Sequence, residues 1–275
     1  MRISVILTCH NRKDKTLECL DHLYSQHNQG VYTIEVFLVD DGCTDGTGEA
    51  VKKKFPGVNV IKGDGSLFWN RGMLLAWDHA LKESTCDAVV WLNDDTMLKD
   101  DAMSIVLNCA QKHPGAIIVG SVADSEGVIS YGGYQVKNVL LRPEQKELPC
   151  CLFNGNVVLV PREVSDKIGL LDKKFSHAMG DFEYGRRASR RGIECFVTPV
   201  LGQCNRNGDY VRWMDTKYSL VKRFKLLYSP LGNNPIEAFY YAKSESLLRA
   251  CFLFLYLNLK ALLPHVFKNR SKLER

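Results

Sequence analysis

The chain has 275 residues, of which 45% are hydrophobic and 24% are charged. This excludes a chain too small or too polar to form a core, and it fits one large domain or a domain with an appendage. The formal net charge of +5 is unevenly distributed. Residues 212–275 carry 12 Lys and Arg against 4 Asp and Glu, a balance of +8, whereas residues 1–211 carry 24 against 27, a balance of −3.

Apolar runs alternate with amphipathic segments through the first 120 residues, which is typical of repeated β-α-β units and a mainly parallel sheet. The predicted strands are residues 3–7, 34–39, 58–61, 88–92, 116–120 and 157–160. The predicted helices are residues 14–26, 72–82, 102–112 and 180–191, together with a short helix that has Pro161 at its first position.

The rhythm changes after residue 120. Glycine-rich turns around Gly127 and Gly132 and the lack of a helical period before Arg162 predict a loop or a short antiparallel section laid over the sheet. Residues 212–235 alternate basic and aromatic side chains, and a final apolar stretch covers residues 238–267. We therefore expect a boundary near residue 211 between an α/β body and a basic, helical C-terminal region.

The N-terminal sequence and the cysteines indicate in which cellular compartment the chain is expected. The first strand leads into polar residues and does not read as a signal peptide, so the chain is expected to stay in the cytosol. None of the ten cysteines forms a Cys-x-x-Cys pair, and most lie in apolar or helical segments, as Cys109 and Cys195 do. We interpret them as small buried thiols rather than as disulfides or structural zinc ligands.

Two predicted strands end in acidic residues. Residues 34–39 run into Asp40 and Asp41 on a glycine-punctuated turn, and residues 88–92 run into Asp94 and Asp95. An α/β sheet presents polar groups to a ligand at such strand ends. Magnesium or manganese typically takes one or two carboxylates while phosphate and water fill its other positions. The pattern predicts a metal-phosphate site, and acids that cap the following helix are the alternative.

Four motifs together resemble the family 2 inverting glycosyltransferases of GT-A fold, and within them the bacterial rhamnosyltransferase-like branch. They are Thr-Cys-His-Asn-Arg at residues 8–12, Asp-Asp-Gly-Cys-Thr-Asp-Gly-Thr at 40–47, Trp-Asn-Arg-Gly at 69–72 and Leu-Asn-Asp-Asp-Thr at 92–96. The resemblance covers roughly residues 1–210 in order. It implies a GT-A type, Rossmann-like and mainly parallel sheet flanked by helices over residues 1–211, with a helical appendage over residues 212–275.

The resemblance also implies where a nucleotide-sugar donor binds. Thr8 and Arg12 would line the nucleotide pocket, with Arg12 near phosphate or base. Asp41, or else Asp40, would accept a hydrogen bond from N3 of a uracil or thymine ring, because a carboxylate is purely an acceptor.

A second loop and the metal follow from the same resemblance. Residues 63–65, which end at Gly65, resemble with Asn70 and Arg71 the family's second nucleotide-contacting loop. Residues 93–95 occupy the Asp-x-Asp position, and Asn93 replaces its first acid. The metal, Mn2+ or Mg2+, is therefore assigned to Asp95, with Asp94 beside it in the donor site.

The catalytic base is expected downstream. An inverting transfer is a single displacement in which a carboxylate removes the proton of the attacking hydroxyl. Residues 175–184 resemble the family segment that holds this base, so Asp181 is predicted to be catalytic. The family often has Glu-Asp where this chain has Gly180 and Asp181. Glu183 is the alternative base, and a helix N-cap is the structural alternative for Asp181.

Several other polar residues in this part of the sequence could either contact a ligand or have a structural role. His177 could touch phosphate, metal or acceptor, residues 154–156 match where the family binds donor sugar or acceptor, and Arg186 or Arg187 could hold phosphate.

The apolar residues 252–263 are too interrupted to span a bilayer. They predict an interfacial helix flanked by Lys268, Arg270, Lys272 and Arg275, with a core helix or a partner contact, including a homo-oligomer, as the alternative.

The combined expectation is a metal-dependent inverting glycosyltransferase that moves a sugar from a UDP- or dTDP-sugar to a hydroxyl of a glycan or lipid-linked acceptor in surface polysaccharide assembly. It would sit peripherally at the anionic cytoplasmic membrane face, and no nucleic acid partner is expected. Two alternatives remain. A sugar-phosphate nucleotidyltransferase would normally carry a glycine-rich basic loop after the first strand, which residues 8–12 are not. A non-catalytic nucleotide-sugar-binding protein would keep the pocket and lack the base.

Overall fold

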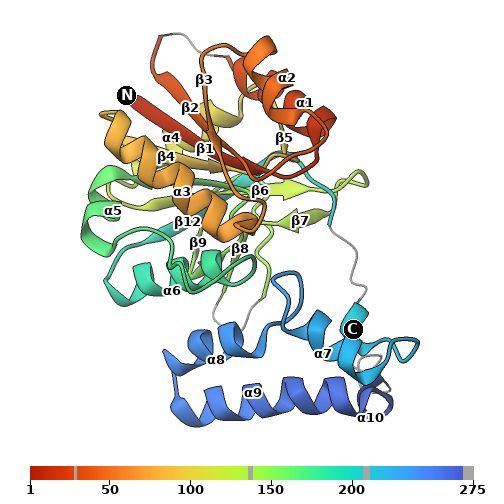
Figure 1. The fold of residues 1–275 in the computed structure, drawn as a ribbon. Helices are drawn as coiled ribbons and strands as arrows, with labels where there is room; N and C mark the ends of the chain where they lie inside the picture. Colours follow the sequence, from red (N-terminus) through yellow and green to blue (C-terminus); the bar gives the residue numbers. More distant parts are fainter. Residues whose placement is uncertain (28–29, 136–138, 207–210, 269–275) are drawn as a thin grey trace. The chain divides into compact units, whose positions relative to one another are not determined.

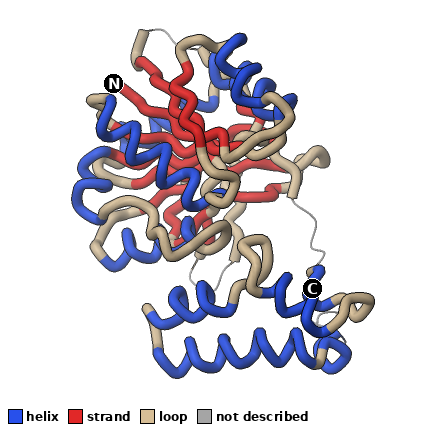
Figure 2. Tube along the Cα trace, viewed as in Figure 1, coloured by secondary structure: helices blue, strands red, loops and turns tan. Residues whose placement is uncertain are grey.

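The computed structural model describes residues 1–27, 30–135, 139–206 and 211–268 (Figures 1 and 2). They form two compact units, which we call the sheet unit and the helical unit. The sheet unit comprises Met1–Lys173 and Gly180–Arg206, and the helical unit comprises Lys174–Met179 and Asn207–Arg275.

The sheet unit has a ten-stranded sheet between helices, and Figure 2 shows the strands gathered in its centre. Its strands are β1 Arg2–Cys9, β2 Thr33–Asp40, β3 Val58–Lys62, β4 Ala88–Leu92, β5 Met97–Leu98, β6 Ile117–Ala123, β7 Ile129–Tyr131, β9 Leu148–Cys150, β11 Val157–Pro161 and β12 Cys195–Gln203. A separate pair is formed by β8 Gly133–Tyr134 and β10 Leu152–Phe153. The helices are α1 Lys13–Tyr24, α2 Thr47–Lys54, α3 Phe68–Glu83, α4 Ala102–Lys112, α5 Arg162–Ile168 and α6 Gly180–Arg190.

The strand order is β3-β2-β1-β4-β11-β6-β12-β5. Strands β3, β2, β1 and β4 are parallel, β11 is antiparallel to both of its neighbours, and β6 and β12 are parallel. The predicted mainly parallel sheet with flanking helices is confirmed. Parallel β1, β2 and β4 end at the same edge, which brings the segments that follow them close together.

Each face of the sheet buries a separate apolar cluster, because successive side chains of a strand point to opposite faces. Val5 and Leu7 of β1 pack with residues of α1, α2 and α4, whereas Ile6 packs with residues of α3, α5 and α6. On the second face Trp91 lies 5.3 Å from Trp77 and 5.2 Å from Tyr184 between ring centroids. These aromatic contacts couple α3, β4 and α6, which carry most of the candidate site.

Several elements differ from the sequence prediction, among them the two-residue strand β5, which was not predicted. Helix α2 and strand β12 were not predicted; β12 contains Pro199 and Gly202, and its register against β6 shifts next to both residues. Such irregularities let a strand accept proline and glycine. Pro161 is the last residue of β11 and precedes α5, so its predicted place as the first helical residue is wrong. Residues 121–161 contribute short antiparallel strands, as the section after residue 120 predicted.

The helical unit packs its own small core. Its elements are a 3-10 turn Arg212–Met214 and the helices α7 Leu220–Leu227, α8 Pro235–Lys243, α9 Leu247–Leu262 and α10 Pro264–Lys268. The predicted apolar stretch 238–267 is thus divided, and Ser246 caps α9 by accepting a hydrogen bond from the Arg249 N–H at 3.4 Å. The core residues are Trp213, Leu227, Ala238, Leu257 and Ala261.

Helix α9 carries an exposed apolar stripe. Leu248, Phe252, Leu255, Leu259 and Leu262 recur three or four residues apart and are all exposed. In the described part of the chain, none of the helices has the length and apolarity needed to cross a membrane. Of the basic residues predicted to flank this segment, Arg270, Lys272 and Arg275 lie outside the described residues.

Candidate functional site

The acid pair after β4 meets Arg12, which lies three residues after the end of β1. Arg12 Nη1 donates to Asp95 Oδ2 at 2.7 Å and to Asp94 Oδ1 at 3.1 Å. Strands β1 and β4 are parallel neighbours, so the residues after their carboxyl ends necessarily lie close together. The structure therefore brings together three of the predicted donor-site residues.

The pair lies in a low-dielectric environment. Burial raises the pKa of the Asp94 carboxyl to about 7; the Arg12 guanidinium opposes this rise and the Asp95 carboxylate adds to it. Thr16 Oγ1 donates to Asp94 Oδ2 at 3.4 Å, and Cys204 Sγ donates to Asp95 Oδ1 at 3.5 Å. Sequence reasoning missed Cys204, because it follows the unpredicted strand β12.

A divalent cation fits this donor set. Asp94 and Asp95 offer hard carboxylate oxygens, the ligand type that Mg2+ and Mn2+ prefer. Arg12 supplies one positive charge to two carboxylates, and the raised pKa of Asp94 indicates that this charge does not fully offset the cost of burial. A dication next to Asp95 would change the net charge of the three side chains from −1 to +1, which suits a bound diphosphate.

Asp41 organises the loop that precedes α3. Its Oδ1 accepts from the Gly65 N–H at 2.8 Å, and its Oδ2 accepts from the N–H groups of Leu67 at 3.1 Å and Phe68 at 3.0 Å. Gly65 has φ +84°, and a Cβ on Gly42 would lie 2.8 Å from the Gly65 Cα. The Asp41 carboxylate thus binds the backbone of the loop that contains Gly65, and its acceptance of a hydrogen bond from a nucleobase stays a prediction, as does the contact of Gly65 with a nucleotide.

The alternative acid, Asp40, has a different environment. Lys62 Nζ contacts its Oδ2 at 2.6 Å, and the Cys43 N–H donates to its Oδ1 at 2.9 Å. Burial would raise the pKa of this carboxyl, but these hydrogen bonds outweigh the burial and hold the pKa below its ordinary value. Asp40 and Asp41 are both buried and each holds a neighbouring turn, so burial does not distinguish them, and the contact of Asp41 rather than Asp40 with the base stays a prediction.

Asn70 and Arg71 of α3 hold the segment that leads toward α6. Asn70 Nδ2 donates to the Asp172 carbonyl at 2.9 Å, and Arg71 Nε donates to the Lys173 carbonyl at 3.2 Å. On the inner side of α3 the half-buried Thr8 faces Gly72, where a Cβ would lie 2.3 Å from Thr8 Oγ1. Contacts of Thr8, Asn70 and Arg71 with a nucleotide stay predictions.

Asp181 is the second residue of α6, inside the helix rather than at its N-cap. Its Oδ2 accepts from the Gly155 N–H at 3.0 Å, and its Oδ1 accepts from the Phe182 N–H at 2.8 Å. Burial raises the pKa of this carboxyl to about 6, although these hydrogen bonds act in the opposite direction. A base with a pKa near the working pH combines basicity with the ability to hold a proton.

The glycine at residue 180 is required by the close approach of Asn70. A Cβ at this position would lie 1.7 Å from Asn70 Oδ1, so a larger residue requires Asn70 to move. The presence of glycine at residue 180, where the family often has glutamate, is therefore explained by the close contact with Asn70. The backbone that directly precedes Asp181 therefore lies against Asn70 of α3.

The alternative base, Glu183, is engaged elsewhere. Its carboxylate accepts from Arg187 Nη2 at 2.8 Å and from Arg187 Nε at 3.1 Å. Arg187 also donates to the carbonyls of Ile168 at 2.7 Å and Leu170 at 2.8 Å. Both residues thus brace the turn after α5, which favours Asp181 as the base and a structural role for Arg187.

One short segment connects the acid pair with Asp181. The Asn93 N–H donates to the Asn156 carbonyl at 3.0 Å, while the Gly155 N–H binds Asp181. Trp69 Nε1 donates to Asn93 Oδ1 at 2.7 Å, and its ring packs on Gly155, where a Cβ would lie 2.4 Å away. Residues 154–156 therefore hold the two carboxylate groups at one edge of the sheet.

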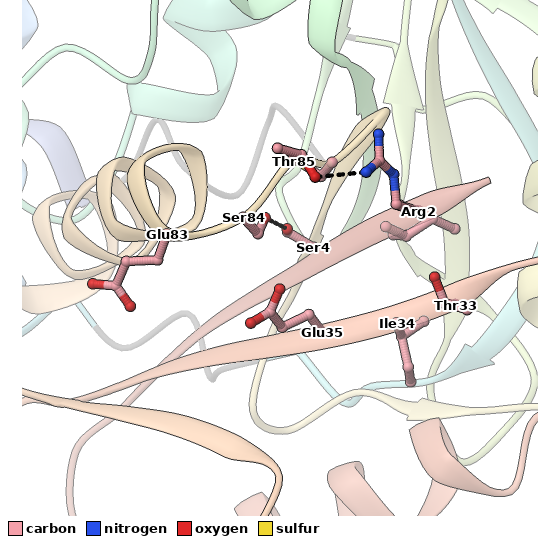
Figure 3. Close-up of a pocket in the computed structure, with 10 residues that line it drawn as sticks. Arg2, Ser4, Thr33, Ile34, Glu35, Glu83, Ser84 and Thr85 are labelled. Carbon is pink, nitrogen blue, oxygen red and sulfur yellow. Dashed lines mark hydrogen bonds between the residues drawn. The ribbon is translucent and has the colours of Figure 1, made fainter.

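A pocket of 260 Å³ lies at the other end of β1 (Figure 3). Figure 3 shows Arg2 bound to Thr85 and Ser4 bound to Ser84 at its wall. The pocket lies at the amino ends of β1 and β2, whereas ligands of open α/β sheets bind outside the carboxyl ends. The carboxyl-end cluster around Arg12, Asp95 and Asp181 is the better candidate site.

Fold comparisons agree with this architecture. S. aureus TarS in complex with UDP-GlcNAc superposes with a TM-score of 0.59 and 17% identity over 90% of this chain and 74% of that chain. The mannosyltransferase PcManGT from Pyrobaculum calidifontis, in complex with GDP-Man and Mn2+, superposes with a TM-score of 0.56 and 18% identity over 98% of this chain and 79% of that chain. At these identities the likeness shows the fold, which is of the GT-A type predicted.

Sequence comparisons give the family. Residues 4–182 match the model of Glycosyl transferase family 2, so the chain belongs to this family, as the motifs predicted. It is 23% identical over 191 residues to an N-acetylglucosaminyl-diphospho-decaprenol L-rhamnosyltransferase, found in two strains of Mycobacterium tuberculosis. That match covers 58% of this chain and 62% of the relative, so the chain spans about three-fifths of the relative's length.

Proposed function

We propose that the chain is a metal-dependent inverting glycosyltransferase that uses a UDP- or dTDP-sugar. The observation that carries the proposal is that residues 154–156 bind two acidic sites. The first is Asp94 and Asp95 beside Arg12, and the second is Asp181, whose pKa is about 6. Family 2 membership and GT-A neighbours that bind UDP-GlcNAc or GDP-Man with Mn2+ support this reading.

The donor diphosphate would bind beside the ends of β1 and β4. Asp95 would hold Mn2+ or Mg2+, and the cation would supply positive charge to the departing diphosphate. Arg12 adds a fixed positive charge at the same place, 2.7 Å from Asp95. The loop held by Asp41 would lie against the nucleoside, with Asp41 accepting from N3 of the base, and Asn70 and Arg71 would contact the donor from α3.

Asp181 would take the proton of the acceptor hydroxyl as that oxygen attacks the anomeric carbon. Its carboxylate is fixed by two backbone N–H groups, so it is oriented before substrate binds. Displacement by one attacking oxygen, without a protein nucleophile, inverts the anomeric configuration. A pKa of about 6 leaves the carboxylate mostly ionised at neutral pH and ready to accept the proton.

The acceptor is proposed to be a glycan or lipid-linked hydroxyl in surface polysaccharide assembly at the cytoplasmic membrane face. The similarity to a rhamnosyltransferase named for a diphospho-decaprenol substrate supports a lipid-linked acceptor. The basic C-terminal region, +8 over residues 212–275, and the exposed apolar stripe of α9 support reversible contact with an anionic bilayer surface. With 16 residues, α9 is shorter than the roughly 20 that a spanning helix needs.

Release of nucleoside diphosphate tests the proposal. The chain is incubated with a panel of UDP-, dTDP- and GDP-sugars, with Mn2+ or with a chelator, and with and without lipid-linked acceptor. We expect Mn2+-dependent turnover of a UDP- or dTDP-sugar that the acceptor accelerates. Binding without turnover of any donor would favour a non-catalytic nucleotide-sugar-binding protein. Formation of a nucleotide sugar and pyrophosphate from a nucleoside triphosphate and a sugar 1-phosphate would favour a nucleotidyltransferase.

A further inference from the structure

A second group of metal-ligating side chains lies on α4 and just before β9. Cys109 lies in the last turn of α4, and His113, four residues on, is the C-cap residue that directly follows the helix. Glu147 directly precedes β9, which pairs with β12. The Cys109 Sγ, a ring nitrogen of His113 and a carboxylate oxygen of Glu147 all lie within 4.8 Å of one another.

The distance between the His113 nitrogen and the Glu147 oxygen is the one expected for two ligands of the same metal ion. His113 Nε2 lies 3.3 Å from Glu147 Oε1, which is longer than the usual N–H···O distance of about 2.9 Å. Tetrahedral zinc binds imidazole nitrogen and carboxylate oxygen at about 2.0–2.2 Å, which puts the two ligand atoms about 3.3–3.5 Å apart. The pair therefore needs little rearrangement to receive the ion.

The surrounding packing orients these side chains. The His113 ring stacks on Phe196 of β12 with centroids 3.7 Å apart and an interplanar angle of 16°. Phe196 is the register partner of Pro149, two residues after Glu147. The pairing of β9 with β12 thus holds the carboxylate and the imidazole from two sides, which lowers the entropic cost of assembling a site.

Two neighbouring groups must change when an ion binds, namely the Cys109 thiol and the Lys112 ammonium. Burial and the nearby Glu147 raise the pKa of the Cys109 thiol to about 11, and a bound dication reverses this by favouring the thiolate. Lys112 Nζ lies 3.3 Å and 3.4 Å from the two Glu147 oxygens, and its side chain is 62% exposed. This ammonium can therefore swing into solvent when a stronger cation takes its place.

We propose that Cys109, His113 and Glu147 bind a zinc ion, with water in the fourth position. A thiol, an imidazole and a carboxylate together are zinc ligands, whereas the all-oxygen pair Asp94 and Asp95 suits Mg2+ or Mn2+. The ion would fasten α4 to β9, and through β10 the chain continues from β9 to residues 154–156, which bind Asp181. The inference is independent of the proposed activity.

Zinc titration of the chelator-stripped full chain tests this inference. We expect one tight equivalent of Zn2+, and with Co2+ an absorption band from thiolate-to-metal charge transfer. His113→Gln and Glu147→Gln should each weaken Zn2+ binding at least about 100-fold. Lys112→Gln should tighten it about tenfold, because it removes a positive charge next to the site. Binding should strengthen with pH, since the thiol must lose its proton.

His79→Gln is the matched control. His79 also faces a glutamate, with its Nδ1 2.6 Å from Glu83 Oε1 on α3, but no cysteine among the described residues completes that pair. Loss of the tight equivalent in His113→Gln and Glu147→Gln, and its retention in His79→Gln, would support the site. No tight equivalent in the wild-type chain, or unchanged binding in His113→Gln, would overturn it. Cys109→Ser should remove the Co2+ charge-transfer band. Because Cys109 is buried, this substitution could also destabilise the fold, so the variants of the half-buried His113 and Glu147 decide the test.

Discussion

Replacing Asp181 by asparagine keeps the shape of the side chain and removes its basicity. General-base catalysis typically contributes about 10²–10⁴-fold to a rate. We therefore expect Asp181→Asn to lower kcat by about 100-fold or more while donor affinity changes little. The wild-type rate should rise with pH through about 6, where the carboxyl loses its proton.

The same substitution has a consequence for stability. The pKa of Asp181 rises from 3.8 to about 6 on folding, which corresponds to about 3 kcal/mol as an upper figure. The folded chain holds this proton more tightly than the unfolded chain, so the Asp181 contribution favours folding below about pH 4. It is lost as the pH rises to about 6 and stays lost above. Asparagine carries no charge, so the variant escapes this loss.

The gain is reduced by hydrogen bonding. Both carboxylate oxygens accept backbone N–H groups, and an amide would turn its own N–H toward one of them, which costs about 1–3 kcal/mol. The pH dependence isolates the electrostatic part, because the protonated carboxyl has the same conflict. Relative to wild type, Asp181→Asn should gain up to about 3 kcal/mol between pH 4 and pH 7.

Urea unfolding at pH 4, 5, 6 and 7 measures this difference. Asp78→Asn is the control, because the Asp78 side chain is exposed on α3, where it pairs with Lys82 at 2.6 Å. Parallel stability profiles for wild type and Asp181→Asn would refute the assigned environment of Asp181. Full turnover in Asp181→Asn with a dead Glu183→Gln variant would show that the base is Glu183.

Three further predictions concern the metal, the α3–α6 contact and the C-terminal stripe. Asp95→Ala should abolish transfer and remove the Mn2+ dependence of donor binding, measured by calorimetry. Gly180→Ala should cost about 1–3 kcal/mol in urea unfolding, because its Cβ meets Asn70, and Asn70→Ala in the same chain should recover part of the loss. Leu248→Glu with Phe252→Glu should weaken co-sedimentation with anionic vesicles by about tenfold or more, because burying either side chain contributes about 1.5–3 kcal/mol.

Each of these has an outcome that contradicts it. Undiminished metal-dependent donor binding in Asp95→Ala would remove the metal from this residue. A Gly180→Ala chain as stable as wild type would mean that Asn70 moves aside freely. Equal vesicle binding by the stripe variant and by a Val128→Glu control, whose site in the sheet unit is also exposed, would show that α9 does not meet the bilayer.

The strands that carry the acids could be predicted because their signals are local. Strands β1, β2 and β4 are short apolar runs that end one to three residues before Arg12, Asp41 and Asp95. Parallel pairing alone then brings the strand ends together. Strand β12 could not be predicted, because Pro199 and Gly202 interrupt its pattern and only the register shifts against β6 accommodate them.

Contacts across the sequence were also beyond prediction. The motif residues Asn70 and Arg71 suggested a nucleotide loop, but their hydrogen bonds to Asp172 and Lys173 depend on how α3 packs beside α6. Cys109 looked like a small buried thiol, because Glu147 reaches it only through the pairing of β9 with the unpredicted β12.

The stereochemistry of transfer tests the central claim most directly. Once a donor is found, the anomeric configuration of the new linkage is read from the proton coupling of the product by nuclear magnetic resonance. A single displacement with Asp181 as base predicts a configuration opposite to that of the donor sugar. Retention of the donor configuration would contradict it, because retention requires a second displacement or a front-side attack that this arrangement of carboxylates does not supply.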